Sequence, residues 1–265
     1  MRIALLVALT LLLPAGCARA LREPRPLDAI AGETAPTPRE EVEVLVSRAE
    51  ALYARRDLPS VREAAGTWLR VAAADRTSVA GVLGAVKARV WLADHEPDPA
   101  ARNESAGSAV EAAQWCGRIA PDDPACSYWL GVALGVQARE RPATALSALP
   151  KMVQAFERAA QAAPGLDHGG PDRALALLHL RAPGWPTGPG DSEKGLEHAR
   201  RAVEIEGGYP ANRLAFAEAL RANGLESEAR QAYEEAVLAA RRSAESGDPD
   251  APDWISEAED ALGRK

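Results

Sequence analysis

The sequence is poor in aromatic residues, in cysteine and in positive charge. Only 5% of its 265 residues are aromatic, three are cysteines, and 38 acidic residues outnumber 31 basic ones, which gives a formal net charge of −7. Without a surplus of Lys and Arg, the chain lacks the electrostatic attraction on which binding to a nucleic-acid backbone depends. We therefore exclude nucleic acid as a partner and interpret the acidity as a contribution to solubility.

Motifs for catalysis are also missing. The sequence contains no GxSxG, no Walker-type loop, no dinucleotide fingerprint and no CxxC pair. Its four histidines, His95, His168, His179 and His198, form no HxxxH motif. His179 and His198 can meet, either as one partly buried and one surface histidine or as the start of a metal site. The absences indicate that the chain is not an enzyme, and we predict no cofactor and no metal.

Alanine is abundant, and 47% of the residues are hydrophobic. Alanine has the highest helix propensity and lets helices approach closely, so this composition favours helix-on-helix packing. Short runs such as EVEVLV lie inside longer helical patterns. The sequence therefore predicts an all-α protein.

The N-terminus has the features of an export signal. A single Arg2 precedes an apolar run from Ile3 to Leu13, followed by Pro14-Ala15-Gly16-Cys17. The run is shorter than the roughly 20 residues that a membrane-spanning helix needs. The segment LLLPAGC resembles the lipobox of bacterial lipoproteins, which implies cleavage before Cys17 and attachment of fatty acyl groups, such as palmitate, to that residue.

Two alternatives remain at the N-terminus, an ordinary cleaved signal with an incidental cysteine and an N-terminal membrane helix. Under the lipoprotein interpretation, residues 1–16 are the signal peptide, and residues 17–40 are a flexible tether from lipidated Cys17 because they are rich in Pro, Gly and charge. Residues 41–265 then form the helical repeat domain.

The other two cysteines, Cys116 and Cys126, flank a predicted helix–helix turn and either form a disulfide or remain two buried thiols.

An internal repeat organises the predicted domain. Five times, a small or apolar residue is followed at +4 and +7 by further core residues, which places all three on one face of a helix. The five triplets are Ala64–Trp68–Val71, Ala109–Ala113–Cys116, Met152–Phe156–Ala159, Gly195–Ala199–Ala202 and Ala229–Tyr233–Ala236. They match the second helix of a tetratricopeptide repeat, and the pairs Leu83-Gly84, Leu130-Gly131 and Phe216-Ala217 match the first. We predict a right-handed solenoid of about five antiparallel helix pairs, closed by a C-terminal capping helix.

The repeat spacing is irregular. Tyr233 follows Ala199 by 34 residues, the tetratricopeptide period, but earlier steps are 43, 43 and 45 residues. We assign the excess to insertions between the two helices of a pair, in 93–100, 140–150 and 181–191. Such insertions would gather along one edge of the solenoid, where repeat proteins often bind partners.

Several segments together resemble TatT, the helical lipoprotein component linked to TRAP transporters. They are LLLPAGC, GVLGAVKARVWLAD, SYWLGVALG, LRAPGWPTGPGDSEKGLEHARRAVEI and YPANRLAFAEAL. The resemblance implies a short helical solenoid in the periplasm that can form homo-oligomers. It also implies pairing with a periplasmic solute-binding protein that captures small organic ligands.

These observations predict a lipid-anchored binding protein of the cell envelope that faces the periplasm. Ala18 is not an acidic residue, which slightly favours the outer membrane over the inner one. The alternative function is a scaffold for envelope or outer-membrane protein assembly. By position, the candidate ligand or partner contacts are Arg89, Tyr128, Trp185, Glu218 and Arg221. For Trp185, a loop plug folded onto its own helix pair is the competing interpretation.

Overall fold

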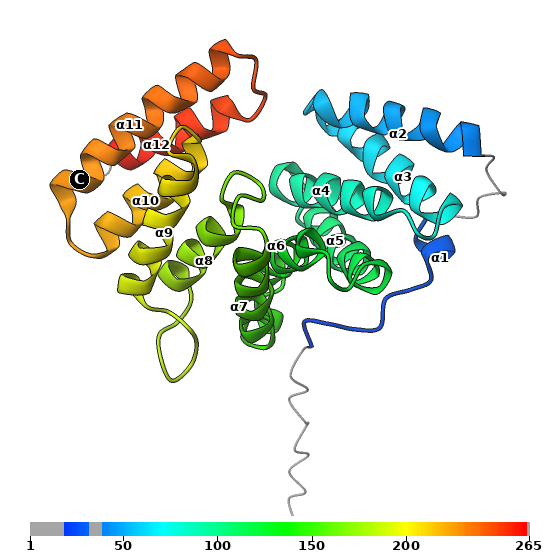
Figure 1. The fold of residues 1–265 in the computed structure, drawn as a ribbon, viewed down its shortest axis with the longest axis horizontal. Helices are drawn as coiled ribbons and strands as arrows, with labels where there is room; N and C mark the ends of the chain where they lie inside the picture. Colours follow the sequence, from blue (N-terminus) through cyan, green and yellow to red (C-terminus); the bar gives the residue numbers. More distant parts are fainter. Residues whose placement is uncertain (1–18, 32–38, 264–265) are drawn as a thin grey trace, which may run out of the picture.

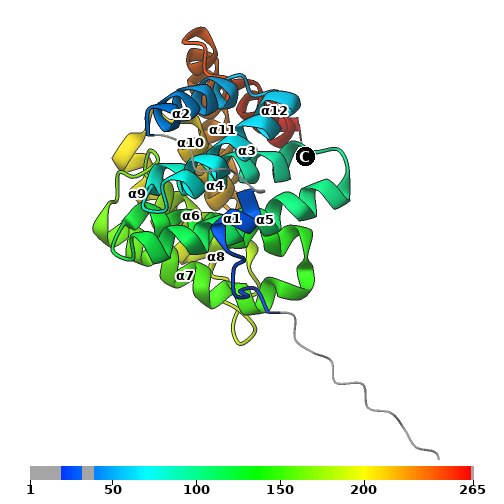
Figure 2. The ribbon, with the colours of Figure 1, turned by 90° about the vertical axis from the view of Figure 1, so that its right-hand side faces the viewer.

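The computed structural model describes residues 19–31 and 39–263, and helices account for most of them (Figures 1 and 2). The helices are α1 (Leu27–Ala31), α2 (Arg39–Ala54), α3 (Leu58–Ala74), α4 (Val79–His95), α5 (Pro99–Ile119), α6 (Pro124–Glu140), a short 3-10 helix (Pro142–Thr144), α7 (Ala145–Ala162), α8 (Gly170–Arg181), α9 (Ser192–Glu206), α10 (Pro210–Ala222), α11 (Glu226–Glu245) and α12 (Ala251–Gly263). No strand occurs in the described ranges. Within these ranges, no helix is both long and apolar enough to cross a bilayer.

The predicted solenoid is confirmed. Helices α2 to α11 form five consecutive antiparallel pairs, and α12 packs on α11 and α10 as the capping helix. Each of the five predicted triplets falls on the second helix of its pair. Capping residues mark the helix ends, since Asp191 accepts hydrogen bonds from two backbone N–H groups at the start of α9 and Gly224 adopts φ 74° just after α10.

The first and second helices of the pairs line different faces. Each first helix contacts the first helix of the next pair, in the series α2, α4, α6, α8, α10, and α12 continues this row. Successive second helices, α3, α5, α7, α9 and α11, have no comparable contacts with one another in the described structure. Because the first helices lie closer together, they form the inner face of the curved row and the second helices form the outer face.

Two glycines let neighbouring helices approach closely, one between successive pairs (α3 and α4) and one within a pair (α6 and α7). A Cβ atom at Gly84 would collide with the ring of Trp68, and one at Gly131 would collide with the ring of Phe156. In each case the glycine lies on a first helix and the aromatic ring on a neighbouring second helix. Close-packed interiors tolerate such added atoms poorly, so these two glycines are packing requirements.

Two of the three predicted insertions, those in 93–100 and 140–150, are wrong, because the structure has no long loop there. Only three residues, 96–98, separate α4 from α5, and the extra length lies in the helices themselves, which have 17 and 21 residues. Residues 140–150 are also mostly helical, as the 3-10 helix and the first turns of α7. Only 182–191 is a true loop. Alanine-rich segments extend as helix wherever a neighbouring helix offers packing, and a count of residues cannot distinguish this from a loop.

The core is divided along the row. One large apolar cluster runs through the first three pairs, and a second one fills the last two pairs and the capping helix. Helix α8 contributes to both, with Leu175 and Leu178 in the first cluster and Ala176 in the second. The described chain therefore has two large apolar blocks that meet at α8, and a third, small cluster around Leu27, Cys116 and Cys126 lies among the helices of the first block.

Candidate functional site

The inner face carries partly exposed aromatic and basic side chains on its first helices. Lys87 of α4 lies 5.4 Å from the ring centroid of Trp129 on α6, and Trp91 of α4 stacks on His95 at 3.9 Å. Tryptophan combines a large apolar area with few rotatable bonds, and this makes it a frequent anchor in protein interfaces. The row Lys87, Trp91 and Trp129 is therefore a candidate protein-binding surface.

A buried polar network joins the two apolar blocks beside this face. The hydroxyl of Tyr128 donates to Asp167 at 2.6 Å, and Arg173 donates to Asp167 and to Asn212, each at 2.8 Å. Asn212 is fully buried, and its amide donates to the carbonyl oxygen of His168 at 2.7 Å and to two other carbonyls at 3.0 Å. Burial raises the pKa of Tyr128, so its hydroxyl stays protonated as a donor. These hydrogen bonds hold the connection between α7 and α8 in place, at the point where the two apolar clusters meet and few apolar contacts link α7 to α8.

The two ends of the row also touch. Arg56, in the turn after α2, donates to Asp250 at 2.9 Å, and Nε2 of His95 lies 3.2 Å from Asp253 at the start of α12. We call these two contacts the clasp. Figure 1 shows the loop between α11 and α12 approaching the end of α2. Helix α12 has no extensive packing against α2, α3 or α4 in the described structure, so the clasp depends on these side chains.

On the outer face, residues 19–31 cross three second helices. The buried Ala20 donates its N–H to Ser147 of α7 at 2.9 Å. Arg25 forms a two-pronged ion pair with Glu111 of α5 at 2.9 and 2.7 Å, and its carbonyl accepts from Trp115 Nε1 at 2.8 Å. The segment ends as α1, which packs on α3 (Figure 1). We call residues 19–31 the strap.

The strap departs from the flexible tether that the sequence indicated over 17–40. Proline, glycine and charge are typical of free linkers, but here Pro24 and Leu27 are buried against the body. The charged residues find partners, with Glu23 bound by Arg118 and Asp28 by Arg76. Composition alone cannot reveal such docking, because the complementary charges are distant in the sequence. Cys17 and the signal segment lie outside the described residues.

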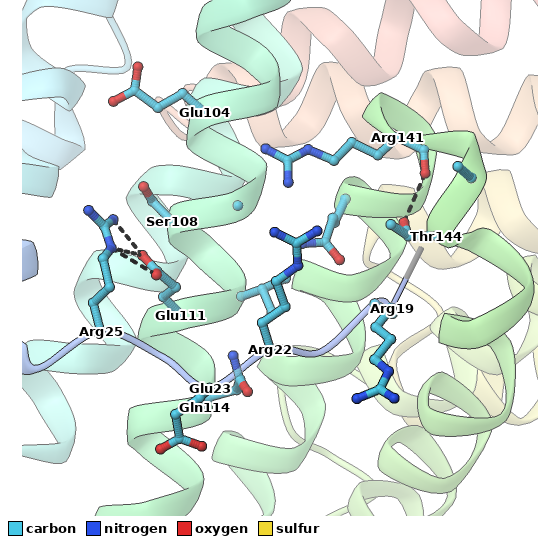
Figure 3. Close-up of a pocket in the computed structure, with 15 residues that line it drawn as sticks. Arg19, Arg22, Glu23, Arg25, Glu104, Ser108, Glu111, Gln114, Arg141 and Thr144 are labelled. Atoms are coloured by element: carbon cyan, nitrogen blue, oxygen red, sulfur yellow. Dashed lines mark hydrogen bonds and ion pairs between the residues drawn. The ribbon is translucent and has the colours of Figure 1, made fainter. Parts of the chain in front are cut away.

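A cavity of about 550 Å³ lies between the strap, α5 and the end of α6 (Figure 3). Its lining includes Arg22 of the strap, Ser108 of α5, and Gln137 and Arg141 at the end of α6. In Figure 3 the guanidinium groups of Arg22 and Arg141 extend into the same space. The arrangement offers positive charge and hydrogen-bonding groups to a small molecule.

The two histidines that the sequence singled out do meet. The rings of His179 and His198 stack at 5.6 Å, and both side chains are largely buried, so neither is a surface histidine. Nδ1 of His198 lies 2.8 Å from Asp172, and Nδ1 of His179 lies 2.7 Å from the carbonyl of Pro189. In the part of the chain that the structure describes, no three His, Cys, Asp or Glu side chains form a metal-binding group. His179 therefore ties the 182–191 loop to α8, and His198 ties α9 to α8.

Trp185 lies at the tip of that loop and is 90% exposed, so the interpretation as a loop plug is wrong. The loop itself is ordered by backbone bonds, since Gly190 donates to Pro183 at 2.9 Å and Gly188 donates to Gly184 at 3.1 Å. Figures 1 and 2 both show the loop projecting from the lower side of the body, where the strap also begins. The exposed indole of Trp185 is therefore carried by a loop that its own backbone hydrogen bonds hold in place.

Three other predicted contacts serve the fold instead. Tyr128 is only 4% exposed, which leaves it no surface for a partner. Glu218 accepts two hydrogen bonds from Arg181, and Arg221 donates to the carbonyl of Ala261 at 2.9 Å, which fixes the capping helix. The position of a residue on a first helix predicts that it lies on the inner face. It does not predict whether a side chain of a neighbouring repeat already bonds to it.

Arg89 remains a candidate. Its Nε atom is buried and has no hydrogen-bond partner among the described residues. Burial lowers the pKa of this guanidinium, and the charges of Glu104 and Glu96 oppose that effect. The other two predicted site residues, Cys116 and Cys126, form a disulfide with an S–S distance of 1.99 Å, which joins α5 to α6.

Comparison with known proteins gives no family assignment. No family model matches the chain, and no curated relative matches it either. Among solved structures, one titled "Crystal structure of MamA protein" has 16% identity and a TM-score of 0.49, and covers 78% of this chain and 95% of that one. Another, titled "MamA RS-1 ArsTM double mutant", has 18% identity and a TM-score of 0.48, and covers 79% and 98%. The fold described above rests on the helix contacts of this chain.

Proposed function

We propose that this protein is a lipid-anchored adaptor of the cell envelope that binds the periplasmic solute-binding protein of a TRAP-type transporter. Its tetratricopeptide-like solenoid is an architecture that binds other proteins and carries out no chemistry of its own. The observation that carries the proposal is the inner face, where Trp91 and Trp129 stand partly exposed beside Lys87. These residues combine aromatic anchors with a positive charge that can meet an acidic partner.

The N-terminus supports the anchored part of the proposal. Cys17 precedes the docked strap by only two residues, a span of at most about 7 Å of chain. A lipid on Cys17 would therefore hold the body close to the bilayer. Trp185 and Leu146 are 90% and 60% exposed. Leu146 adjoins Ser147, which binds the strap near its start, and the Trp185 loop projects on the same side, so both would lie near the headgroup layer, where indole rings are favoured.

Capture from the solubilised envelope tests the partner. We expect the full-length protein to co-purify with a periplasmic solute-binding protein, and the Trp91→Ala, Trp129→Ala double variant to lose it. The matched control is Leu238→Ala, which removes an exposed apolar side chain from the second helix α11. If outer-membrane assembly factors are recovered instead, the alternative scaffold function is favoured, and the transporter assignment is wrong.

Mass spectrometry of the intact protein tests the anchor. The expected product starts at Cys17 and carries acyl chains, whereas Cys17→Ser leaves the protein unmodified and releases it from membranes. Unmodified Cys17 in the native protein would contradict the anchor without affecting the partner experiment. Single-chain lipid anchors are weak, so exposed Trp185 is expected to add to membrane retention, and Trp185→Ala should increase the released fraction.

A further inference from the structure

The cavity under the strap is formed by two separate parts of the chain. The strap supplies one wall, and α5 with the end of α6 and the 3-10 helix supplies the others. Its volume of about 550 Å³ falls within the range of roughly 300 to 1,000 Å³ that is usual for small-molecule sites. Because the strap crosses the second helices, this cavity opens on the outer face, away from the aromatic row of the inner face.

Gln137 is a buried polar group without a partner in this cavity. Its side chain is 6% exposed, and Oε1 accepts no hydrogen bond from the described residues. A buried amide oxygen that has lost its water and gained no donor reduces the stability of the fold. A ligand that donates a hydrogen bond to Oε1 would remove this cost, which is the physical reason to assign Gln137 to a binding site.

The charges around Gln137 are positive in excess. Glu111 is already paired with Arg25, and Glu23 is paired with Arg118. Arg19 and Arg22 form no ion pair with the described residues, and Arg141 is bound only by the neutral amide of Asn103. The carboxylate of Glu104 is the negative charge in the lining that opposes these three positive guanidinium groups.

The orientation of the arginines fits a small anion. Figure 3 shows Arg22 reaching from the strap toward Arg141 of the body, so that two like charges face one space. A carboxylate between them would replace their repulsion by charge-assisted hydrogen bonds, since guanidinium groups match the geometry of carboxylate oxygens. The nearby Oε1 of Gln137 would at the same time accept from a hydroxyl or an ammonium group.

We propose that the cavity binds a small organic acid that carries both a carboxylate and a hydrogen-bond donor, that is, a hydroxy- or amino-carboxylate. Arg22 and Arg141 hold the carboxylate, and Gln137 holds the donor. Because the ligand contacts the strap and the body together, binding tightens the strap on α5. This site is independent of the partner surface and of the anchor, so its test does not depend on the proposed function.

Titration calorimetry on the full-length protein in detergent is the direct test, with lactate, malate, citrate and serine as probes and with glycerol and inorganic phosphate as comparisons. We expect at least one carboxylate to bind, glycerol not to bind, and Arg22→Ala or Arg141→Ala to weaken binding about tenfold or more, a loss of about 1.4 kcal/mol. Arg55→Ala, at an exposed arginine outside the cavity, should bind as the unmodified protein does. Binding of phosphate alone, or of none of the probes, would overturn the assignment.

Gln137→Leu separates a binding role from a structural one. Leucine is similar in size and removes the unpaired acceptor, so we expect this variant to melt at a higher temperature while it binds the acid more weakly. In the unmodified protein, the bound acid should slow hydrogen exchange of the strap amides at residues 20–25. Unchanged affinity in Gln137→Leu, or unchanged exchange in the strap on binding, would show that the cavity is not the site.

Discussion

The two apolar blocks of the solenoid are built from the same repeat but are reinforced differently. The first three pairs have long helices, a disulfide between α5 and α6, and the strap across their outer face. The last two pairs follow the standard 34-residue step, and within the described residues they have the capping helix but neither a disulfide nor a covering segment like the strap. At the junction, the polar network around Asn212 replaces part of the apolar packing. The first block is therefore reinforced by a crosslink and by the strap, whereas the second depends on its own packing, on α12 and on the network at the junction.

The largest expected effect is on the core of the first block. Gly131→Val places carbon atoms where the Phe156 ring lies, and we expect a loss of about 3 kcal/mol or more in the free energy of unfolding, measured by urea denaturation. The control is Gly117→Ala, because nothing lies within 4 Å of a Cβ atom at that helical glycine. Ala should increase stability by about 0.5 to 1 kcal/mol there. Equal effects of the two changes would contradict the packing role of Gly131.

Removal of the disulfide sharpens the comparison, because only the first block contains it. Cys116 and Cys126 are separated by 10 residues, and the loss of such a crosslink costs about 2 to 3 kcal/mol. In the double alanine variant, hydrogen exchange should accelerate in α5 and α6 and stay unchanged in α10 and α11. Equal acceleration in both blocks would show that they unfold as one unit.

Asn212→Ala tests the junction itself. The change removes the amide's hydrogen bonds to three backbone carbonyl oxygens and one of the acceptors of Arg173, and we expect a loss of about 2 kcal/mol. Because the network joins the blocks, thermal unfolding should separate into two transitions. A single transition shifted to lower temperature would indicate that α8 couples the blocks through apolar contacts alone.

The smallest expected effect on stability is at the clasp. The Arg56–Asp250 pair is only partly buried, so Arg56→Ala should cost less than about 1 kcal/mol. It should nevertheless increase the radius of gyration in X-ray scattering, because little else holds α12 near α2. Arg48→Ala breaks an exposed pair with Glu63 inside the first helix pair and should leave the radius unchanged. An unchanged radius in Arg56→Ala would show that the ends stay together without the clasp.

Local patterns predicted the architecture well, and long-range contacts explain most of what they missed. The +4 and +7 spacing located all five second helices, because the residues on the core face of a helix recur at this spacing within a single short segment. The docking of Arg25 on Glu111 and the contact of Arg56 with Asp250 join residues 86 and 194 positions apart. Neither pair forms a motif. Similarly, Arg221 and Glu218 looked free because the helix that engages each of them belongs to another repeat.

The central claim is that the inner face binds a periplasmic partner while the outer face does not. Photo-crosslinking in living cells tests it most directly, with a photoreactive residue at Trp91 on the inner face or at Leu238 on the outer one. The account predicts a crosslink from position 91 to a periplasmic solute-binding protein and none to that protein from position 238. A crosslink to that protein from position 238 alone, or from neither position, would contradict it.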